Sequence, residues 1–160
     1  MPHLHSAPCA ANAFLASHAA LLVDSYHRLT GKHLLPPDTD PTIAAESLFN
    51  APFVVLSHDN QDDPIFTYGN RTAQNLFELE WDELLQLPSR YSAEAPNREE
   101  RARLLQQVTE KGFIDNYQGI RISKTGKRFM VKDALVWNLI DANGVKHGQA
   151  AAFSTWLPSQ

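Results

Sequence analysis

The carboxylate that the sequence places best for acid–base chemistry is Asp133, in the segment RFMVKDALVWNLI (residues 128–140). Apolar residues alternate along this segment, as in a strand with one buried face. Strict alternation puts Asp133 on the apolar face, between Val131 and Leu135. A buried carboxylate of this kind is a candidate general base. The alternative is structural: a bulge or twist turns Asp133 to the sheet edge, or an arginine pairs with it.

A second group with binding chemistry lies in the segment PSRYSAE (residues 88–94). Asn97 opens an Asn-x-x-Glu capping box, so the helix that follows starts without help from this segment. The segment therefore needs another role, and Arg90 and Tyr91 are its candidates for ligand binding. An inward Arg90 would bind a carboxylate or phosphate through two parallel hydrogen bonds. An outward Arg90 would pair with Glu94 and have no function.

Aromatic and polar residues elsewhere in the chain complete a predicted small-molecule pocket. Ligand sites combine apolar walls with a few polar groups, and the candidate side chains are of these two kinds. The predicted ligand-binding residues are Tyr68, Asn70, Arg90, Tyr91, Trp137, Gln149 and Phe153. Alternation puts Trp137 on the same face as Asp133, and both Trp137 and Phe153 have a second interpretation as plain sheet core. Asn70 is also placed to cap a short helix.

The histidines do not suggest a metal site. Seven histidines are spread along the sequence, and no His and Cys cluster has metal-ligand spacing. His58 and His147 lie at strand ends, where exposed turn histidines are expected, and His18 lies on an apolar helix face, where it would pack. The sequence also contains no nucleophile-elbow motif and no phosphate-binding loop. We therefore expect a binding module rather than an enzyme.

These candidate residues depend on elements that the sequence pattern predicts. Residues 1–9 are expected to be disordered, residues 10–50 to form N-terminal helices, and residues 51–160 to form the core. The core has the order β-β-α-α-α-β-β-β, and hairpin turns at KTGK and DANG join its last three strands. The predicted strands are 53–58, 65–70, 113–123, 128–140 and 145–157. The predicted fold is an α+β domain: a five-stranded antiparallel sheet with short helices on one face, preceded by N-terminal helices.

The first predicted helix carries a broad apolar stripe. Phe14, Leu15, Leu22 and Leu29 fall on this stripe. It either packs on the chain's own sheet or pairs with a second copy, and its width favours both. A homodimer is therefore expected, with these four residues at the interface.

The composition is that of one soluble domain. The chain has 160 residues, of which 43% are hydrophobic. A net charge of −4 argues against a nucleic-acid-binding surface. No run reaches the ~20 apolar residues that a membrane span needs. The single Cys9 excludes an internal disulfide, and no signal peptide is evident, so a cytoplasmic protein is expected.

The order of elements and several local stretches resemble the PAS fold. YGNRTAQNLFELEWDELL resembles the PAS segment in which a strand delivers an asparagine into a helix, and RISKTGKRFMVKDALVWNLIDANGVKHGQAAAF resembles the C-terminal PAS meander. More closely, PSRYSAE, the YQGIRIS–GKRF pair and VWNLID–GVKHGQAAAF–W resemble the MEKHLA family, over roughly residues 12–157. That family is a PAS-related domain of small bacterial proteins and of the C-terminus of certain plant homeodomain–zipper transcription factors. The chain has no homeodomain and no zipper.

The PAS resemblance implies a cavity between the sheet and the short helices. In that family such cavities hold haem, flavin, small acids or aromatic compounds, or nothing. PAS photosensors have a reactive cysteine, and the resemblance places Ser89 of this chain at the corresponding position. A serine cannot form the thiol adduct. The resemblance also places Val131 where those photosensors have an asparagine that contacts the flavin. The sequence therefore argues against a photochemical flavin. It also argues against haem, which would need an axial ligand, usually histidine.

Three functions are consistent with this resemblance. The first is a stand-alone sensor or interaction domain that binds an unidentified small molecule and acts through a partner protein or by self-association. The second is a small enzyme with Asp133 as base and Arg90 or Tyr91 orienting an anionic substrate. The third is a pure dimerisation module, with Phe129, Trp137 and Phe153 filling the cavity. The first two predict an enclosed cavity of roughly several hundred Å³.

Overall fold

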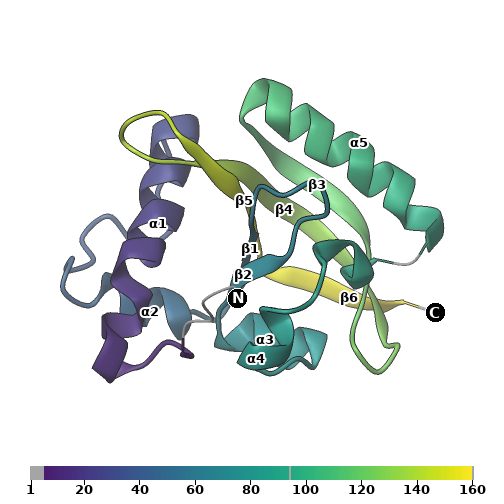
Figure 1. Ribbon diagram of the computed structural model, residues 1–160, viewed down its shortest axis with the longest axis horizontal. Coiled ribbons are helices and arrows are strands. Elements are labelled where there is room, and N and C mark those ends of the chain that lie inside the picture. Colours follow the sequence, from purple (N-terminus) through teal and green to yellow (C-terminus); the bar gives the residue numbers. More distant parts are fainter. Residues whose placement is uncertain (1–5, 94, 160) are drawn as a thin grey trace.

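The computed structural model describes residues 6–93 and 95–159, and it describes no side chain at 95–98, 101 and 105. One antiparallel sheet lies between helices on both of its faces (Figure 1). The helices are η1 (Ala10–Leu15), α1 (Ala16–Thr30), α2 (Ala44–Phe49), α3 (Arg71–Phe77), α4 (Trp81–Leu84), η2 (Ser89–Ser92) and α5 (Ala95–Lys111), η being a 3-10 helix. The strands are β1 (Val54–His58), β2 (Phe66–Gly69), β3 (Phe113–Ile122), β4 (Arg128–Ile140), β5 (Lys146–Phe153) and β6 (Thr155–Ser159).

The sheet has six strands rather than the five predicted, in an α+β fold. Its order is β2-β1-β5-β4-β3, and β6 pairs with β4. The predicted last strand, 145–157, is divided at Ser154 into β5 and β6. β5 pairs with the second half of β4 and with β1, whereas β6 pairs only with the first half of β4. The division comes where β1 begins, because Val54 is the partner of Phe153 and nothing on β1 continues the ladder past Ser154.

A bulge in β4 changes which side chains share a face of the sheet. Tyr117 pairs with Ala134 and Gly119 with Val131, so Lys132 and Asp133 lie opposite the single residue Gln118. Asp133 has a left-handed backbone, with a φ of 51°, and its side chain is exposed. The inward orientation of Asp133 is therefore wrong, and the alternative, a bulge that turns this residue away from the core, is correct. Strict alternation along 128–140 fails because the extra residue shifts the two-residue period by one.

The bulge divides the apolar side chains of β4 between two cores. Before it, Phe129 and Val131 face α3 and α4, and after it Ala134 and Val136 continue that face toward α5. Trp137 and Leu139 face α1 and α2 on the opposite side of the sheet. Figure 1 shows these two sides, with α1 and α2 to the left of the sheet and α5 to the right. The chain therefore has one core on each face.

Helix α1 packs on the sheet through hydrogen bonds as well as apolar contacts. The Ser25 hydroxyl accepts from the backbone N–H of Ile140 at 3.1 Å, and the His18 Nε2 lies 2.9 Å from the Ser57 hydroxyl. Gly31 ends the helix in a left-handed conformation that suits glycine, as the sequence predicts. The apolar stripe of α1 faces the chain's own sheet.

The four residues predicted for a dimer interface lie within this intramolecular packing. Leu22 is 0% exposed, so it contacts no second copy in this conformation. Phe14, Leu15 and Leu29 are half-buried against the same core. Dimerisation itself stays a prediction, with at most these three residues contributing to it.

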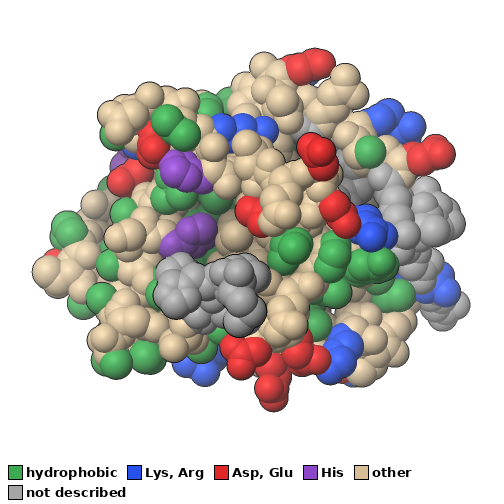
Figure 2. All heavy atoms as spheres, in the orientation of Figure 1, with side chains coloured by type: hydrophobic (Ala, Val, Ile, Leu, Met, Phe, Trp, Pro, Cys, Tyr) green, Lys and Arg blue, Asp and Glu red, His purple; other side chains and the backbone are tan. Residues whose placement is uncertain are grey.

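The surface carries mixed charges. Figure 2 shows acidic side chains gathered over α3 and α4, at the bottom of the view, with basic side chains beside them. No helix in the described part of the chain combines the length and apolarity needed to cross a bilayer. Residues 1–9 are predicted to be disordered, and residues 1–5 of this range lie outside the described residues. The carbonyls of Ser6 and Ala7 accept hydrogen bonds from the Asn12 side chain.

Candidate functional site

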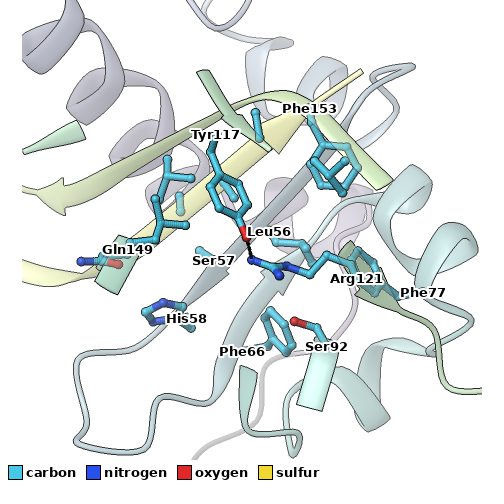
Figure 3. Close-up of a pocket in the computed structure, with 16 residues that line it drawn as sticks. Leu56, Ser57, His58, Phe66, Phe77, Ser92, Tyr117, Arg121, Gln149 and Phe153 are labelled. Carbon is cyan, nitrogen blue, oxygen red and sulfur yellow. Dashed lines mark hydrogen bonds between the residues drawn. The ribbon is translucent and has the colours of Figure 1, made fainter. Parts of the chain in front are cut away.

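A cavity lies between the sheet and the helices α3, η2 and α5 (Figure 3). Its volume is about 70 Å³, well below the several hundred predicted. The walls are mostly apolar, and none of the described residues that line it is acidic. The lining residues are Leu56, Ser57, His58, Phe66, Phe77, Ser92, Leu104, Tyr117, Arg121, Val131, Ala134, Val136, Gln149, Ala150, Ala151 and Phe153. This space suits one small molecule of a few non-hydrogen atoms.

The charged group of the cavity is Arg121, on β3. Its Nη2 donates to the Tyr117 hydroxyl at 2.6 Å, and its Nη1 donates to the carbonyl of Ile120 at 3.0 Å. In Figure 3 the Tyr117 side chain comes from the top of the view and the Arg121 side chain from the right, and their polar ends meet near the middle of the residues drawn. No ion pair recorded among the described residues includes Arg121. A half-buried guanidinium thus lies against apolar walls, and no carboxylate in the described part of the chain pairs with it.

Gly119 allows Tyr117 to reach Arg121. A side chain at position 119 would begin 2.2 Å from the Tyr117 hydroxyl oxygen and 2.7 Å from its Cζ. The tyrosine ring therefore lies along β3, across the space that a Cβ would occupy. Tyr117, Gly119 and Arg121 share one face of the strand by its two-residue period.

The other polar groups of the cavity wall are held by the protein. The Gln149 Nε2 donates to the Asn138 Oδ1 at 3.1 Å, and the Ser92 hydroxyl donates to the carbonyl of Ser89 at 2.7 Å. The His58 Nδ1 lies 2.8 Å from the carbonyl of Asp59, which requires that this nitrogen carry the proton. These contacts fix the orientation of the side chains around Arg121.

Two of the predicted ligand-binding residues, Gln149 and Phe153, line the cavity. Tyr68 and Trp137 do not, because both face α1 and α2 across the sheet. The Trp137 ring packs 5.0 Å from the ring of Tyr26, and burial raises the pKa of Tyr68 well above its usual range. For Trp137 the predicted face is wrong because of the bulge at Asp133.

Asn70 serves the fold and lies outside the cavity lining. Its Oδ1 accepts from the backbone N–H groups of Val55, at 3.1 Å, and Ala73, at 3.0 Å. Its Nδ2 donates to the carbonyls of Leu48, at 3.1 Å, and Phe53, at 2.8 Å. The predicted cap of α3 is correct, and all four contacts of the Asn70 side chain are to the chain's own backbone rather than toward the cavity.

Arg90 and Tyr91 point away from the cavity. The 89–92 segment forms a 3-10 turn with three residues per turn, so Ser89 and Ser92 face inward and the two residues between them face outward. The Arg90 Nε pairs with the Asp63 carboxylate at 3.0 Å, and its guanidinium lies 4.2 Å from the centre of the Tyr91 ring. The predicted alternative partner, Glu94, lies outside the described residues.

Five polar residues of the cavity lining are not among the predicted ligand-binding residues: Ser57, His58, Ser92, Tyr117 and Arg121. In YQGIRIS the apolar Ile120 and Ile122 lie on one face of the strand, and the opposite face carries Tyr117 and Arg121. The Tyr-x-Gly-x-Arg spacing was the available signal, since alternation puts all three residues on one side. With Asp133 exposed, the enzyme hypothesis also loses the base that it required.

Three or more metal-ligating side chains do not come together in residues 6–93 or 95–159. A flavin does not fit the cavity either. Its volume of about 70 Å³ is small beside the roughly 300 Å³ or more of typical cofactor and drug sites. The lining residue Val131 offers flavin no polar contact, and Ser89 is fully buried and lacks a thiol.

The chain is similar in sequence to one described family and in fold to known sensor domains. A model of the MEKHLA domain matches residues 16–158. No curated protein matches the chain significantly. The PAS domain of a protein from Colwellia psychrerythraea superposes with a TM-score of 0.60 at 12% identity, over 72% of this chain and 92% of that one.

Two receptor structures also share the fold. The fungal blue-light photoreceptor Vivid, in its light-state dimer, superposes with a TM-score of 0.58 at 12% identity, over 84% of this chain and 90% of that one. An RNA-binding light-oxygen-voltage receptor superposes with a TM-score of 0.60 at 16% identity, over 79% of this chain and 35% of its own. At these identities the likeness shows the PAS fold alone.

Proposed function

The chain belongs to the MEKHLA domain family and has a PAS-like sensor fold, and from this premise we propose that it binds a small molecule in the cavity around Arg121. The observation that carries this proposal is a half-buried guanidinium that faces apolar walls and pairs with no carboxylate of the described residues. A buried charge is costly unless another group compensates it. A ligand that compensates Arg121 would therefore gain affinity from N–H groups that Tyr117 and Ile120 do not use.

The proposed signal passes from the cavity to helix α1 through β1. Leu56 and His58 line the cavity, and Ser57 between them contacts His18 of α1 at 2.9 Å. A ligand that shifts β1 would therefore change how α1 docks. We propose that α1 transmits this change to a partner protein, or to a second copy through the half-buried Phe14 and Leu15.

Mass spectrometry of the purified protein tests ligand binding. Native and denatured masses would be compared, and a bound molecule appears as a mass lost on denaturation. The wild type would be compared with the variant Ala151→Leu, in which the larger side chain occupies the cavity that Ala151 lines. We expect a mass difference for the wild type, none for Ala151→Leu, and retention in Ala102→Leu, which enlarges an exposed position of α5.

The alternative is a dimerisation module with a filled core, which the small cavity favours. It predicts that no molecule is released and that no compound of a small-metabolite library raises the melting temperature. It also predicts that Ala151→Leu changes the proportion of dimer no more than Ala102→Leu does. That combination would end the ligand proposal.

A further inference from the structure

We infer that the ligand class is a short monocarboxylate of about three or four carbons, held by Arg121 and Tyr117, and this inference rests on the proposed function. The carboxylate lies against the guanidinium and the phenol, and the hydrocarbon end lies against the apolar walls. Propionate is the reference compound for this class.

The donors of the site converge on one acceptor group. The guanidinium has five N–H groups, and the described contacts use two of its nitrogens, toward Ile120 and Tyr117. Because the Tyr117 oxygen accepts from Arg121, its own O–H is directed elsewhere, and no described group accepts it. The phenol and guanidinium, 2.6 Å apart, therefore offer two donors to a single carboxylate.

The walls select against a second charge. Most of the remaining lining residues are apolar, among them Phe66, Phe77, Val131, Val136 and Phe153. A second carboxylate would be buried against these side chains, and burying an unpaired charge is costly. The cavity volume of about 70 Å³ also limits the hydrocarbon chain to a few carbons. The site therefore favours a monocarboxylate over a dicarboxylate.

Gly119 is a positioning residue for this site. A methyl group at position 119 would displace the Tyr117 ring, because its Cβ would lie 2.2 Å from the phenol oxygen. The Gly119→Ala variant keeps both donors and moves one of them. Alanine is compatible with the strand backbone at this position, where φ is not in the left-handed region. Lost affinity in this variant would therefore report misplacement of the phenol rather than its removal.

Calorimetric titration with propionate, propionamide and malonate tests the inference on the full chain. We expect propionate to bind, and the neutral propionamide and the doubly charged malonate to bind at least about tenfold more weakly. Arg121→Gln should weaken propionate binding about tenfold or more, and Gly119→Ala severalfold. The matched control is Arg103→Gln, which makes the same charge change on the exposed side of α5 and should leave binding unchanged.

The outcomes separate this inference from the function on which it rests. Equal binding of propionamide, or unchanged propionate binding in Arg121→Gln, overturns the carboxylate class while ligand binding stands. Equal or tighter binding of malonate overturns the single-charge argument in the same way. Absence of binding by all three compounds also overturns the carboxylate inference. If the purified protein then releases no molecule in the mass comparison, the proposed function fails with it.

Discussion

His18 on α1 and Ser57 on β1 are joined by a hydrogen bond of 2.9 Å between Nε2 and Oγ. The same hydroxyl lies 2.8 Å from the Thr67 hydroxyl on β2. One buried serine thus connects an N-terminal helix, the strand that lines the cavity and the neighbouring edge strand. This contact is the most direct polar connection between the cavity wall and α1.

Replacing Ser57 with alanine should loosen α1. The variant removes the hydroxyl that His18 and Thr67 share, and we expect a loss of about 1–2 kcal/mol in the free energy of unfolding. Hydrogen exchange should become faster in the first turns of α1. Ser17→Ala, at an exposed position of the same helix, serves as control. Unchanged exchange in α1 would mean that apolar packing alone holds the helix.

Replacing Asn70 with alanine should destabilise the whole chain. The side chain is fully buried and makes four hydrogen bonds to backbone groups that would lose their partner. We expect a loss of about 3 kcal/mol or more, measured by urea unfolding. Asn75→Ala, on the exposed face of α3, should stay within about 0.5 kcal/mol of the wild type. Similar losses in the two variants would show that the network contributes little.

The stability of the fold should depend on the backbone preference of the residue at position 133 rather than on its charge. A β-branched residue is strained at a φ of 51°, so Asp133→Val should lose about 1–2 kcal/mol, whereas Asp133→Gly avoids that strain. Lys132→Val puts the same side chain one residue earlier, at a position with ordinary strand geometry, and should be tolerated. A fully stable Asp133→Val would contradict the bulge.

The pH dependence of stability should show the contribution of the Glu78 carboxylate. Hydrogen bonds from Ser123 and Thr125, with Lys127 nearby, lower the pKa of this carboxyl below its usual range. A lowered pKa in the folded state stabilises the fold above the ordinary glutamate pKa, and this stabilisation is lost as the pH falls through the folded value. Glu78→Gln should therefore melt at a lower temperature than wild type at pH 7.

The difference in melting temperature between Glu78→Gln and wild type should shrink steadily below about pH 4.5. Glu46→Gln, at an exposed position of α2, is the matched control and should show a smaller difference at pH 7. A difference that stays constant down to pH 3 would assign the effect to packing rather than to charge.

Much of the fold could be predicted from sequence because local patterns determine it. The strands around the KTGK and DANG turns, the glycine end of α1 and the Asn70 cap all follow from short-range chemistry. The family resemblance also fixed the fold class. What failed was side-chain direction, because it depends on register over the whole strand, and one extra residue at Asp133 reversed the assignment of Trp137.

The candidate site could be predicted only in part for the same reason. Gln149 and Phe153 lie after the last irregularity that affects their face, and alternation alone places them correctly. Arg90 was misplaced because a charged residue in a loop has no periodic pattern, and its partner Asp63 is distant in sequence. Arg121 could not be assigned from the strand pattern alone, since alternation puts Tyr117, Gly119 and Arg121 on one face but does not show that this face lines the cavity.

The bulge in β4 makes the cavity depend on chain length as well as on residue type. Val131 and Ala134 are three residues apart and face the same side because the bulge holds one extra residue. Deletion of Asp133 would bring them to the regular two-residue spacing, so Val136 would stay in the cavity wall and Trp137 would stay against α1. A strand of unchanged length without the bulge would instead turn Trp137 into the cavity and Val136 out of it. Loss of this one codon would therefore preserve the cavity, whereas straightening the strand at full length would fill it.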